Sequence, residues 1–233
     1  YLQLPQREKL DILTRFLEVK QSQATLIFVR TRNASTELAE KLQARGYSAA
    51  ALNGDLNQSA REKVISRIKK GDLDIIVATD VAARGIDVER VNLVVNYDIP
   101  YDVESYIHRI GRTGRAGRKG EALLFVTPRE RRLYKLIQSA MGDSLKSIEP
   151  PSREELIRKR DEKMHADVLR VLKYPKKLST YRKLLDEITQ QEEIGADDVA
   201  LALLHLIKRD HPLPVDRLPA ETKKRDNFSS KPR

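Results

Sequence analysis

The residues best suited to do chemistry in this sequence are the arginines of the run HRIGRTGRAGR, which extends from His108 to Arg118. An arginine side chain stays charged and offers a planar fork of donors that matches phosphate oxygens, and glycine lets a phosphate approach the backbone. Glycines separate arginines that recur every three residues: Arg109, Arg112, Arg115 and Arg118. At helical spacing the first three would point into one cleft, so the run predicts an anion site. The alternative is a basic surface patch exposed to solvent.

A second group of reactive side chains lies in the loop ATDVAARGID, from Ala78 to Asp87, directly after an apolar run. Asp87 is placed to accept hydrogen bonds from a ribose, and Thr79 to donate to a backbone phosphate. Asp80 has two interpretations of equal weight. It either contacts the nucleotide site or serves the structure, as a helix N-cap or as the partner of a nearby arginine.

A third candidate is the segment GDLNQSAR, which begins at Gly54 and precedes a predicted helix from about Gln58. Backbone amides at a helix N-terminus bind phosphate readily, and Arg61 one turn into the helix would reinforce that site. The alternative is an ordinary helix cap with Arg61 in solvent.

The elements that must position these groups alternate between short apolar strands and amphipathic helices. Strands are expected at residues 25–30, before Gly54, and at 73–79, 91–97 and 121–126. Helices are expected between them, ending at Gly46 and Gly71, starting from Tyr101, and covering Leu133 to Ala140. This alternation predicts an α/β fold, a parallel sheet with helices on both faces, whose ligands bind at the carboxyl ends of the strands.

The pattern changes after Met141, where glycine and two prolines interrupt it and no further strand follows. Ser152 and Glu155 suggest a capping box that opens the first of three helices, a small all-α domain over 152–210. Three helices of this length make a marginal core, which could be stabilised by packing against the first domain or against a second copy of the chain. Of these two we expect the second, a homodimer through this region. The boundaries are then 1–141, a linker at 142–151, the helical domain, and a basic disordered segment at 211–233.

Composition narrows the partner. The 233 residues include 44 Lys and Arg against 34 Asp and Glu, a net charge of +10 that favours a polyanion. Because cysteine is absent, disulfides, thiolate metal sites and cysteine nucleophiles are excluded. No apolar run approaches the roughly 18 residues of a membrane span, and no signal peptide opens the chain, so we expect a cytoplasmic protein without membrane contact. Since Tyr1 stands where Met would start a protein, we expect a fragment.

The order of the motifs carries a resemblance. FVRT, NGD followed by QSAR, ATDVAARGID, VVNYDIP and HRIGRTGRAGR together resemble the second RecA-like domain of DEAD-box RNA helicases, over about residues 1–140. With the helical region and basic segment, the chain is similar to the bacterial cold-shock helicases of the DeaD or CsdA type. The resemblance implies ATP hydrolysis coupled to RNA unwinding in the full-length protein. It also implies roles in the stress response, ribosome biogenesis and RNA degradation, with ribosomal precursors or the RNA-decay machinery as partners.

The resemblance also implies a role for individual positions. Arg112 and Arg115 match the arginine fingers that reach the ATP phosphates, while Asp87, with Gly85 beside it, matches the ribose contact. Six positions match residues that hold the RNA backbone without reading sequence: Arg30, Thr31, Gly54, Gln58, Arg61 and Thr79. Four match positions that couple the ATP and RNA sites: Asp80, Arg84, His108 and Arg109.

Two motifs of a complete helicase do not occur in these residues, the G-x-x-x-x-G-K-[ST] loop and the Asp-Glu-Ala-Asp box. The resemblance therefore implies that ATP and its Mg²⁺ are held by a separate first domain, that this chain has no metal site, and that alone it does not hydrolyse ATP. The alternative function is a non-catalytic RNA-binding and assembly platform. A translocating helicase of a related branch fits the motifs less closely.

Overall fold

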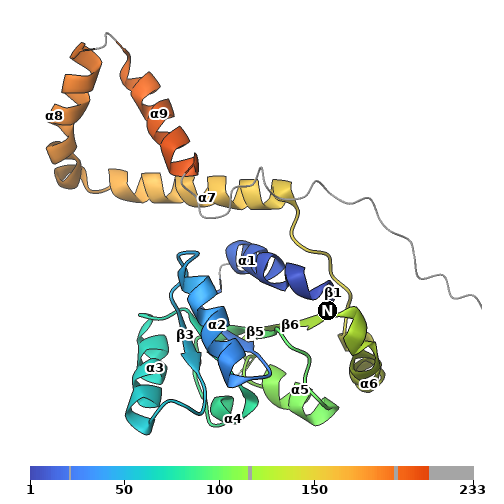
Figure 1. Ribbon diagram of the computed structural model, residues 1–233. Helices are drawn as coiled ribbons and strands as arrows, with labels where there is room; N and C mark the ends of the chain where they lie inside the picture. Colours follow the sequence, from blue (N-terminus) through green and yellow to red (C-terminus); the bar gives the residue numbers. More distant parts are fainter. Residues whose placement is uncertain (21, 115–116, 192–193, 210–233) are drawn as a thin grey trace, which may run out of the picture. The chain divides into compact units, whose positions relative to one another are not determined.

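The computed structural model describes residues 1–20, 22–114, 117–191 and 194–209. It contains two compact units, Tyr1–Pro151 and a second that starts at Ser152 (Figure 1). Arg115 and the expected disordered segment 211–233 lie outside the described residues.

A parallel sheet forms the centre of the first unit, as predicted. Within its described residues the sheet has six strands in the order β1-β6-β5-β2-β4-β3, and every pairing is parallel. The strands are β1 (Leu2–Gln3), β2 (Ala24–Phe28), β3 (Ala49–Leu52), β4 (Ile75–Ala78), β5 (Val91–Asn96) and β6 (Glu121–Val126).

Helices cover both faces of this sheet because successive side chains of a strand point to opposite sides. Ile27 packs in one apolar core with α1 (Lys9–Lys20) and α2 (Arg32–Gln43). Its neighbour Phe28 packs on the other face with α3 (Gln58–Lys70) and α4 (Asp80–Ala83). A third core joins β6 to α5 (Val103–Ile110) and α6 (Arg131–Met141). The described part of this unit also contains three short 3₁₀ turns: η1 (Gln6–Glu8), η2 (Pro128–Glu130) and η3 (Gly142–Ser144).

The predicted helix signals are mostly confirmed. Gly71 ends α3 with a left-handed φ of +91°, which a side chain would resist. The sequence pattern did not predict β1, α1 or α4. β1 has two residues and α4 has four, too few to show a period, and α1 precedes the alternating region on which the prediction rested.

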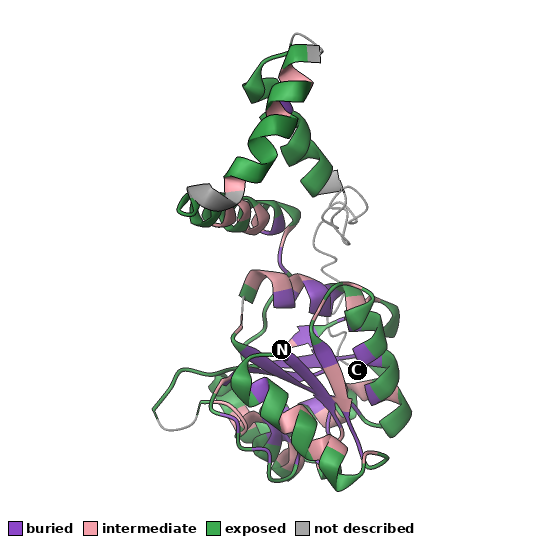
Figure 2. Cartoon of the chain, turned by 90° about the vertical axis from the view of Figure 1, so that its left-hand side faces the viewer, coloured by how far each residue is buried: buried purple, intermediate pink, exposed green. Residues whose placement is uncertain are grey.

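The second unit consists, in its described part, of helices α7 (Arg153–Leu172), α8 (Pro175–Gln191) and α9 (Ala196–Arg209). Ser152 caps α7 by accepting a hydrogen bond from the Glu155 amide at 3.1 Å, and α8 contacts both other helices. Of the side chains described here, only those of Leu156 and Val199 are buried, and most of the surface is exposed (Figure 2). No described helix combines the length and apolar character needed to cross a bilayer.

Candidate functional site

Four neighbouring strands end at one edge of the sheet, which we call the carboxyl edge. The parallel registers align Phe28 of β2 with Ala78 of β4 and with Asn96 of β5, and Leu52 of β3 with Ala78. The residues that follow these strand ends therefore meet at one edge, the place where open α/β sheets bind ligands.

All six residues expected to hold RNA lie at the carboxyl edge or in the first turn of a helix that leaves it. None of their side chains is buried. They lie in the connections β2–α2, β3–α3 and β4–α4 or in the first turn of α3: Arg30, Thr31, Gly54, Gln58, Arg61 and Thr79. The structure thus brings together residues that are up to 49 positions apart in the sequence.

The side chains of this group are held in place by neighbours on other elements. Arg30 donates from Nη2 to Glu130 at 3.1 Å, and its guanidinium carbon lies 5.2 Å from the centre of the Tyr101 ring. Arg61 donates from Nη2 to the carbonyl oxygen of Arg84 at 2.8 Å, so it is not the purely solvated charge of the alternative interpretation. The carboxyl edge therefore presents cations in fixed positions, which lowers the entropic cost of binding an anion.

Helix caps and one buried amide fix the backbone of the same connections. The Thr31 hydroxyl accepts a hydrogen bond from Ala34 N at 3.1 Å, and Asn57 caps α3 by accepting one from Ala60 N at 2.8 Å. Asn53, buried at the end of β3, donates to the Ser35 hydroxyl at 2.9 Å. Thr79 precedes α4 without using its side chain as a cap, so its hydroxyl is not committed to the helix.

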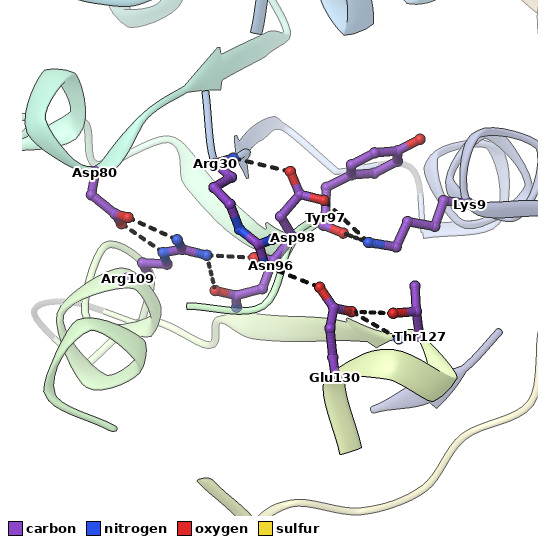
Figure 3. A network of polar contacts seen from close by, with 9 residues as sticks. All are labelled: Lys9, Arg30, Asp80, Asn96, Tyr97, Asp98, Arg109, Thr127 and Glu130. Atoms are coloured by element: carbon purple, nitrogen blue, oxygen red, sulfur yellow. Dashed lines mark hydrogen bonds and ion pairs between the residues drawn. The ribbon is translucent and has the colours of Figure 1, made fainter. Parts of the chain in front are cut away.

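Arg109 is buried inside the unit rather than exposed in a cleft. Its Nε and Nη2 donate to the two carboxylate oxygens of Asp80 at 2.6 and 2.8 Å, and its Nη1 donates to Asn96 Oδ1 at 3.2 Å and to the Asp98 carbonyl at 2.7 Å (Figure 3). Its guanidinium also stacks 5.0 Å from the centre of the Phe28 ring. Of the two interpretations of Asp80, the structure shows the arginine partner.

Asp98 continues this network to the other side of the carboxyl edge. Its Oδ2 accepts from the Arg30 amide at 3.0 Å, and its Oδ1 accepts from Lys9 Nζ at 3.1 Å (Figure 3). Lys9 also donates to the Tyr97 carbonyl at 2.6 Å, and its side chain is completely buried. Burial, followed by the charge of Asp98, raises the pKa of the Tyr97 hydroxyl to about 12. One carboxylate thus links a buried cation to the backbone of the expected RNA-binding loop.

The expectation that Arg109 and Arg112 share one cleft is wrong. Helix α5 ends at Ile110 with Gly111 as its C-cap, so helical spacing does not extend to Arg112. Arg112 is half-buried and donates from Nη1 to the Ile86 carbonyl at 3.1 Å.

That hydrogen bond places Arg112 beside the loop that holds the expected nucleotide contacts. Asp87 follows Ile86 directly and is exposed, and Gly85 precedes it with a left-handed φ of +75°. The structure therefore brings the expected ribose contact and the first expected arginine finger to one place. The second expected finger, Arg115, lies outside the described residues.

Three further residues singled out in the sequence are exposed. His108 is exposed on α5, and Arg84, from the loop ATDVAARGID, is exposed directly after α4. Arg118 is 58% exposed and forms an ion pair with Glu89 at 2.8 Å, so it is a surface charge with a partner.

Two contacts anchor the segment that follows α5. The Thr113 hydroxyl donates to the Val91 carbonyl at 2.8 Å, which ties the segment to the start of β5. At Gly120 a Cβ would overlap Thr113 Oγ1 and the Gly114 amide nitrogen, so the backbone folds back on itself there. Both anchors lie next to the arginines expected to meet ATP.

Sequence reasoning missed Lys9, Asn96, Asp98 and Glu130 as members of this site. Asp98 had a visible signal, because it follows a buried apolar strand as Asp80 does. Glu130 forms a full capping box with Thr127, a pattern that sequence can show. Lys9 had no such signal, since only the fold reveals that the start of α1 lies against the end of β5.

Comparisons with known proteins match both units. The family model described as the helicase conserved C-terminal domain matches residues 8–117, and that of the RNA helicase DeaD dimerization domain matches residues 151–217. ATP-dependent RNA helicase DeaD of Escherichia coli K12 is 49% identical over 210 residues, which cover 89% of this chain and 33% of that protein. Its counterpart from Mycobacterium tuberculosis H37Rv is 48% identical over 195 residues, 84% of this chain and 34% of that protein. The chain thus spans about a third of the length of these curated relatives.

Solved structures agree with the sequence comparisons. The Escherichia coli DEAD-box protein SrmB, bound to regulator of ribonuclease activity A, has a TM-score of 0.61 and 35% identity, and the match covers 64% of this chain and 88% of that one. Saccharomyces cerevisiae Dbp5, bound to RNA and ADP BeF3, has a TM-score of 0.58 and 36% identity, with 63% of this chain and 40% of that one covered. The C-terminal domain of the DEAD-box protein Dbp5 gives 0.57 and 35% identity, with 63% and 86% covered.

Proposed function

The chain belongs to the DEAD-box proteins and consists of a C-terminal RecA-like helicase domain followed by a DeaD-type dimerisation domain. On this premise we propose that the chain couples RNA binding to ATP hydrolysis in an ATP-dependent RNA helicase. The observation that supports the proposal is that the six residues expected to hold RNA, which come from three separate parts of the sequence, lie together at the carboxyl edge. The whole protein would be the enzyme, and this chain would be the part that closes onto nucleotide held elsewhere.

RNA would bind along the carboxyl edge through its phosphates. Arg30 and Arg61 supply charge there, and Thr31 and Thr79 supply hydroxyl groups. Gly54 lies on the connection between β3 and α3, and Gln58 is the first residue of α3. Contacts of this kind fix the position of a strand without reading its bases, so binding would be independent of sequence.

ATP would be contacted from the side of Arg112. Asp87 would accept hydrogen bonds from the ribose, with Gly85 beside it, while Arg112 and Arg115 would neutralise charge on the phosphates. ATP with Mg²⁺ would be held mainly by a preceding RecA-like domain. Since phosphoryl transfer is accelerated largely by positioning and charge neutralisation, an arginine that arrives only on domain closure makes hydrolysis depend on that closure.

The buried network would couple the two sites. Arg109 joins Asp80 on α4 to the end of β5, while His108 and Arg84 are exposed nearby on the elements that Arg109 connects. A change in position of α4 is therefore transmitted to α5, the helix that leads directly to Arg112. We assign the coupling role to Asp80, Arg84, His108 and Arg109 on this basis.

The second unit would form a homodimer. The proposed domain boundaries are 1–141 for the RecA-like domain, 142–151 for a linker, 152–210 for the helical dimerisation domain and 211–233 for a basic segment. Exposed apolar side chains on all three helices support this assignment. We also propose a cytoplasmic location, cold-shock and stress-response roles, and ribosomal precursors or the RNA-decay machinery as partners, by analogy with the DeaD relatives.

The test uses the full-length protein with a fluorescein-labelled poly(U) oligonucleotide. Substitution Arg112→Ala should lower RNA-stimulated ATP turnover by about 1,000-fold or more, the effect of losing an arginine finger, and leave RNA affinity unchanged. Arg115→Ala should do the same, and Arg118→Ala, a matched surface control, should change neither. Loss of RNA affinity alone would instead support the non-catalytic platform.

RNA affinity should fall steeply as salt rises, because phosphate contacts release counterions. The expected measurement is a linear fall of log affinity with log salt concentration, with a smaller slope in Arg61→Ala. A flat response would contradict binding through the RNA backbone.

A further inference from the structure

Lys9 is the most deeply buried charged side chain in the network, and the proposed function gives it no task. Its side chain is completely buried, although lysine is almost always exposed in proteins unless it is paired. Its ammonium group lies just beyond the end of β5, where it meets the Tyr97 carbonyl and the Asp98 carboxylate at 2.6 and 3.1 Å. Burying an ammonium group is costly, so its placement needs an explanation.

The Asp98 carboxylate divides its two oxygens between Lys9 and Arg30. Oδ1 receives the Lys9 ammonium, and Oδ2 receives the backbone amide of Arg30 at 3.0 Å. The Asp98 side chain is only 15% exposed, so water competes little for either oxygen. Lys9 therefore fixes the rotation of the carboxylate, and the carboxylate fixes the backbone at Arg30.

The held backbone is the start of the β2–α2 connection. Arg30 lies two residues after β2 ends at Phe28, and Thr31 caps α2. The Arg30 side chain has its own separate anchors in Glu130 and Tyr101. Different groups thus fix the backbone and the side chain of one residue. Removal of Lys9 would loosen the backbone from which the Arg30 side chain extends, so the side chain would be less well positioned for RNA.

We propose that Lys9 is a positioning residue for RNA binding, which acts through Asp98 to hold the Arg30 backbone in its RNA-binding conformation. The inference rests on the proposed function of the carboxyl edge as the RNA site. It adds to that function a residue on α1, an element that carries none of the expected RNA or ATP contacts.

A pair of double-mutant cycles in the full-length protein tests this role, with the labelled poly(U) oligonucleotide as the probe. Lys9→Met should weaken RNA affinity about tenfold and leave the KM for ATP unchanged, as a lost coupling of about 1.4 kcal/mol would give. The effect of Arg30→Ala should be smaller in the Lys9→Met background than in the wild type. The effect of Arg61→Ala, at another strand end, should be the same in both backgrounds.

Lys20→Met is the matched control, because Lys20 lies on the same helix but pairs with Glu121 at the surface. It should leave RNA affinity and both cycles unchanged. If Lys9→Met does not fold, the double variant Lys9→Met/Asp98→Asn is used in its place in both cycles, because it removes the buried positive charge and its negative partner together. A side-chain amide without an ammonium tether holds the Arg30 amide less firmly than the carboxylate, so the expected cycles are the same.

Hydrogen exchange separates this inference from the proposed function, because it is measured without RNA. A peptide covering residues 29–34 should exchange faster in Lys9→Met than in the wild type or in Lys20→Met. Unchanged exchange, or additive effects of Lys9 and Arg30 on RNA affinity, would overturn the role of Lys9. If exchange rises but neither Arg30→Ala nor Arg61→Ala weakens RNA binding, the carboxyl edge is not the RNA site and the proposed function fails instead.

Discussion

The buried side chain of Arg109 stabilises the first unit, because its hydrogen bonds link α4 to the end of β5. It has four hydrogen bonds to three residues that belong to α4 and to the end of β5. A guanidinium can satisfy this set because its donors are fixed in one plane, whereas a lysine ammonium cannot make the two-point contact with Asp80. Conservative replacement should therefore be costly.

Arg109→Lys should lower the free energy of unfolding by about 3 kcal/mol, since the buried side chain loses hydrogen bonds to the half-exposed Asp80 carboxylate and to the end of β5. Urea unfolding of this chain checks the prediction as a lower midpoint at an unchanged slope. Arg118→Lys is the control, because its partner Glu89 is exposed, and it should change stability by less than about 0.5 kcal/mol. Equal urea midpoints for the two variants would show that the hydrogen bonds of Arg109 do not contribute to the stability of the protein.

For individual residues, the sequence showed which side chains belong to the site better than it showed what those side chains contact. It selected Arg109 from its spacing but expected it beside Arg112, because spacing alone does not show where a helix ends. The two interpretations of Asp80 could not be separated, since the choice depends on a partner 29 positions away. Lys9 was missed for the same reason, as its partners lie 88 and 89 positions away.

Elements were predicted well where they are long and periodic. α3 begins at Gln58 and ends before Gly71 as expected, because its cap residues and apolar period agree. The carboxyl edge could also be predicted, since parallel strands must end together once their order along the chain is known. The order of strands in the sheet was not predicted, because it depends on packing between distant segments.

The segment between α5 and β6 provides a prediction at the scale of elements. Gly120→Ala should displace this segment, because a Cβ would overlap Thr113 Oγ1 and the Gly114 amide nitrogen. We expect a loss of about 1–3 kcal/mol in stability, as for other overpacked sites. In the full-length protein ATP turnover should fall more than RNA affinity, since the displaced segment adjoins Arg112.

Turnover and urea unfolding together check this prediction. Lys119→Ala, which changes a neighbouring side chain without crowding the backbone, serves as the control and should have little effect on either. A Gly120→Ala variant with normal turnover would show that the segment tolerates displacement.

Across the whole molecule, the two units differ in how they bury apolar surface. The first has three apolar cores around its sheet, whereas the described helices of the second leave large apolar side chains exposed. Leu184 and Leu203 are each 54% exposed, which is typical of an interface and not of a core within the unit.

Leu184→Asp or Leu203→Asp should therefore give a folded monomer, because each places a charge where a second copy would pack. Light scattering at micromolar concentration measures the mass, and circular dichroism confirms that helix content is kept. A wild-type chain that is already monomeric would contradict the dimer, and unfolding of the variants would assign these leucines to an internal core.

In the proposed binding mode, the alignment of β2, β4 and β3 at the carboxyl edge would also limit the length of RNA that this chain contacts. Neighbouring strands lie about 4.8 Å apart, so contacts drawn from three of them cover about 10 Å. A few consecutive nucleotides fill that distance. The spacing of the strands would thus set the number of nucleotides that the carboxyl edge can contact. Oligonucleotides longer than these few nucleotides should gain little affinity from further contacts with this edge.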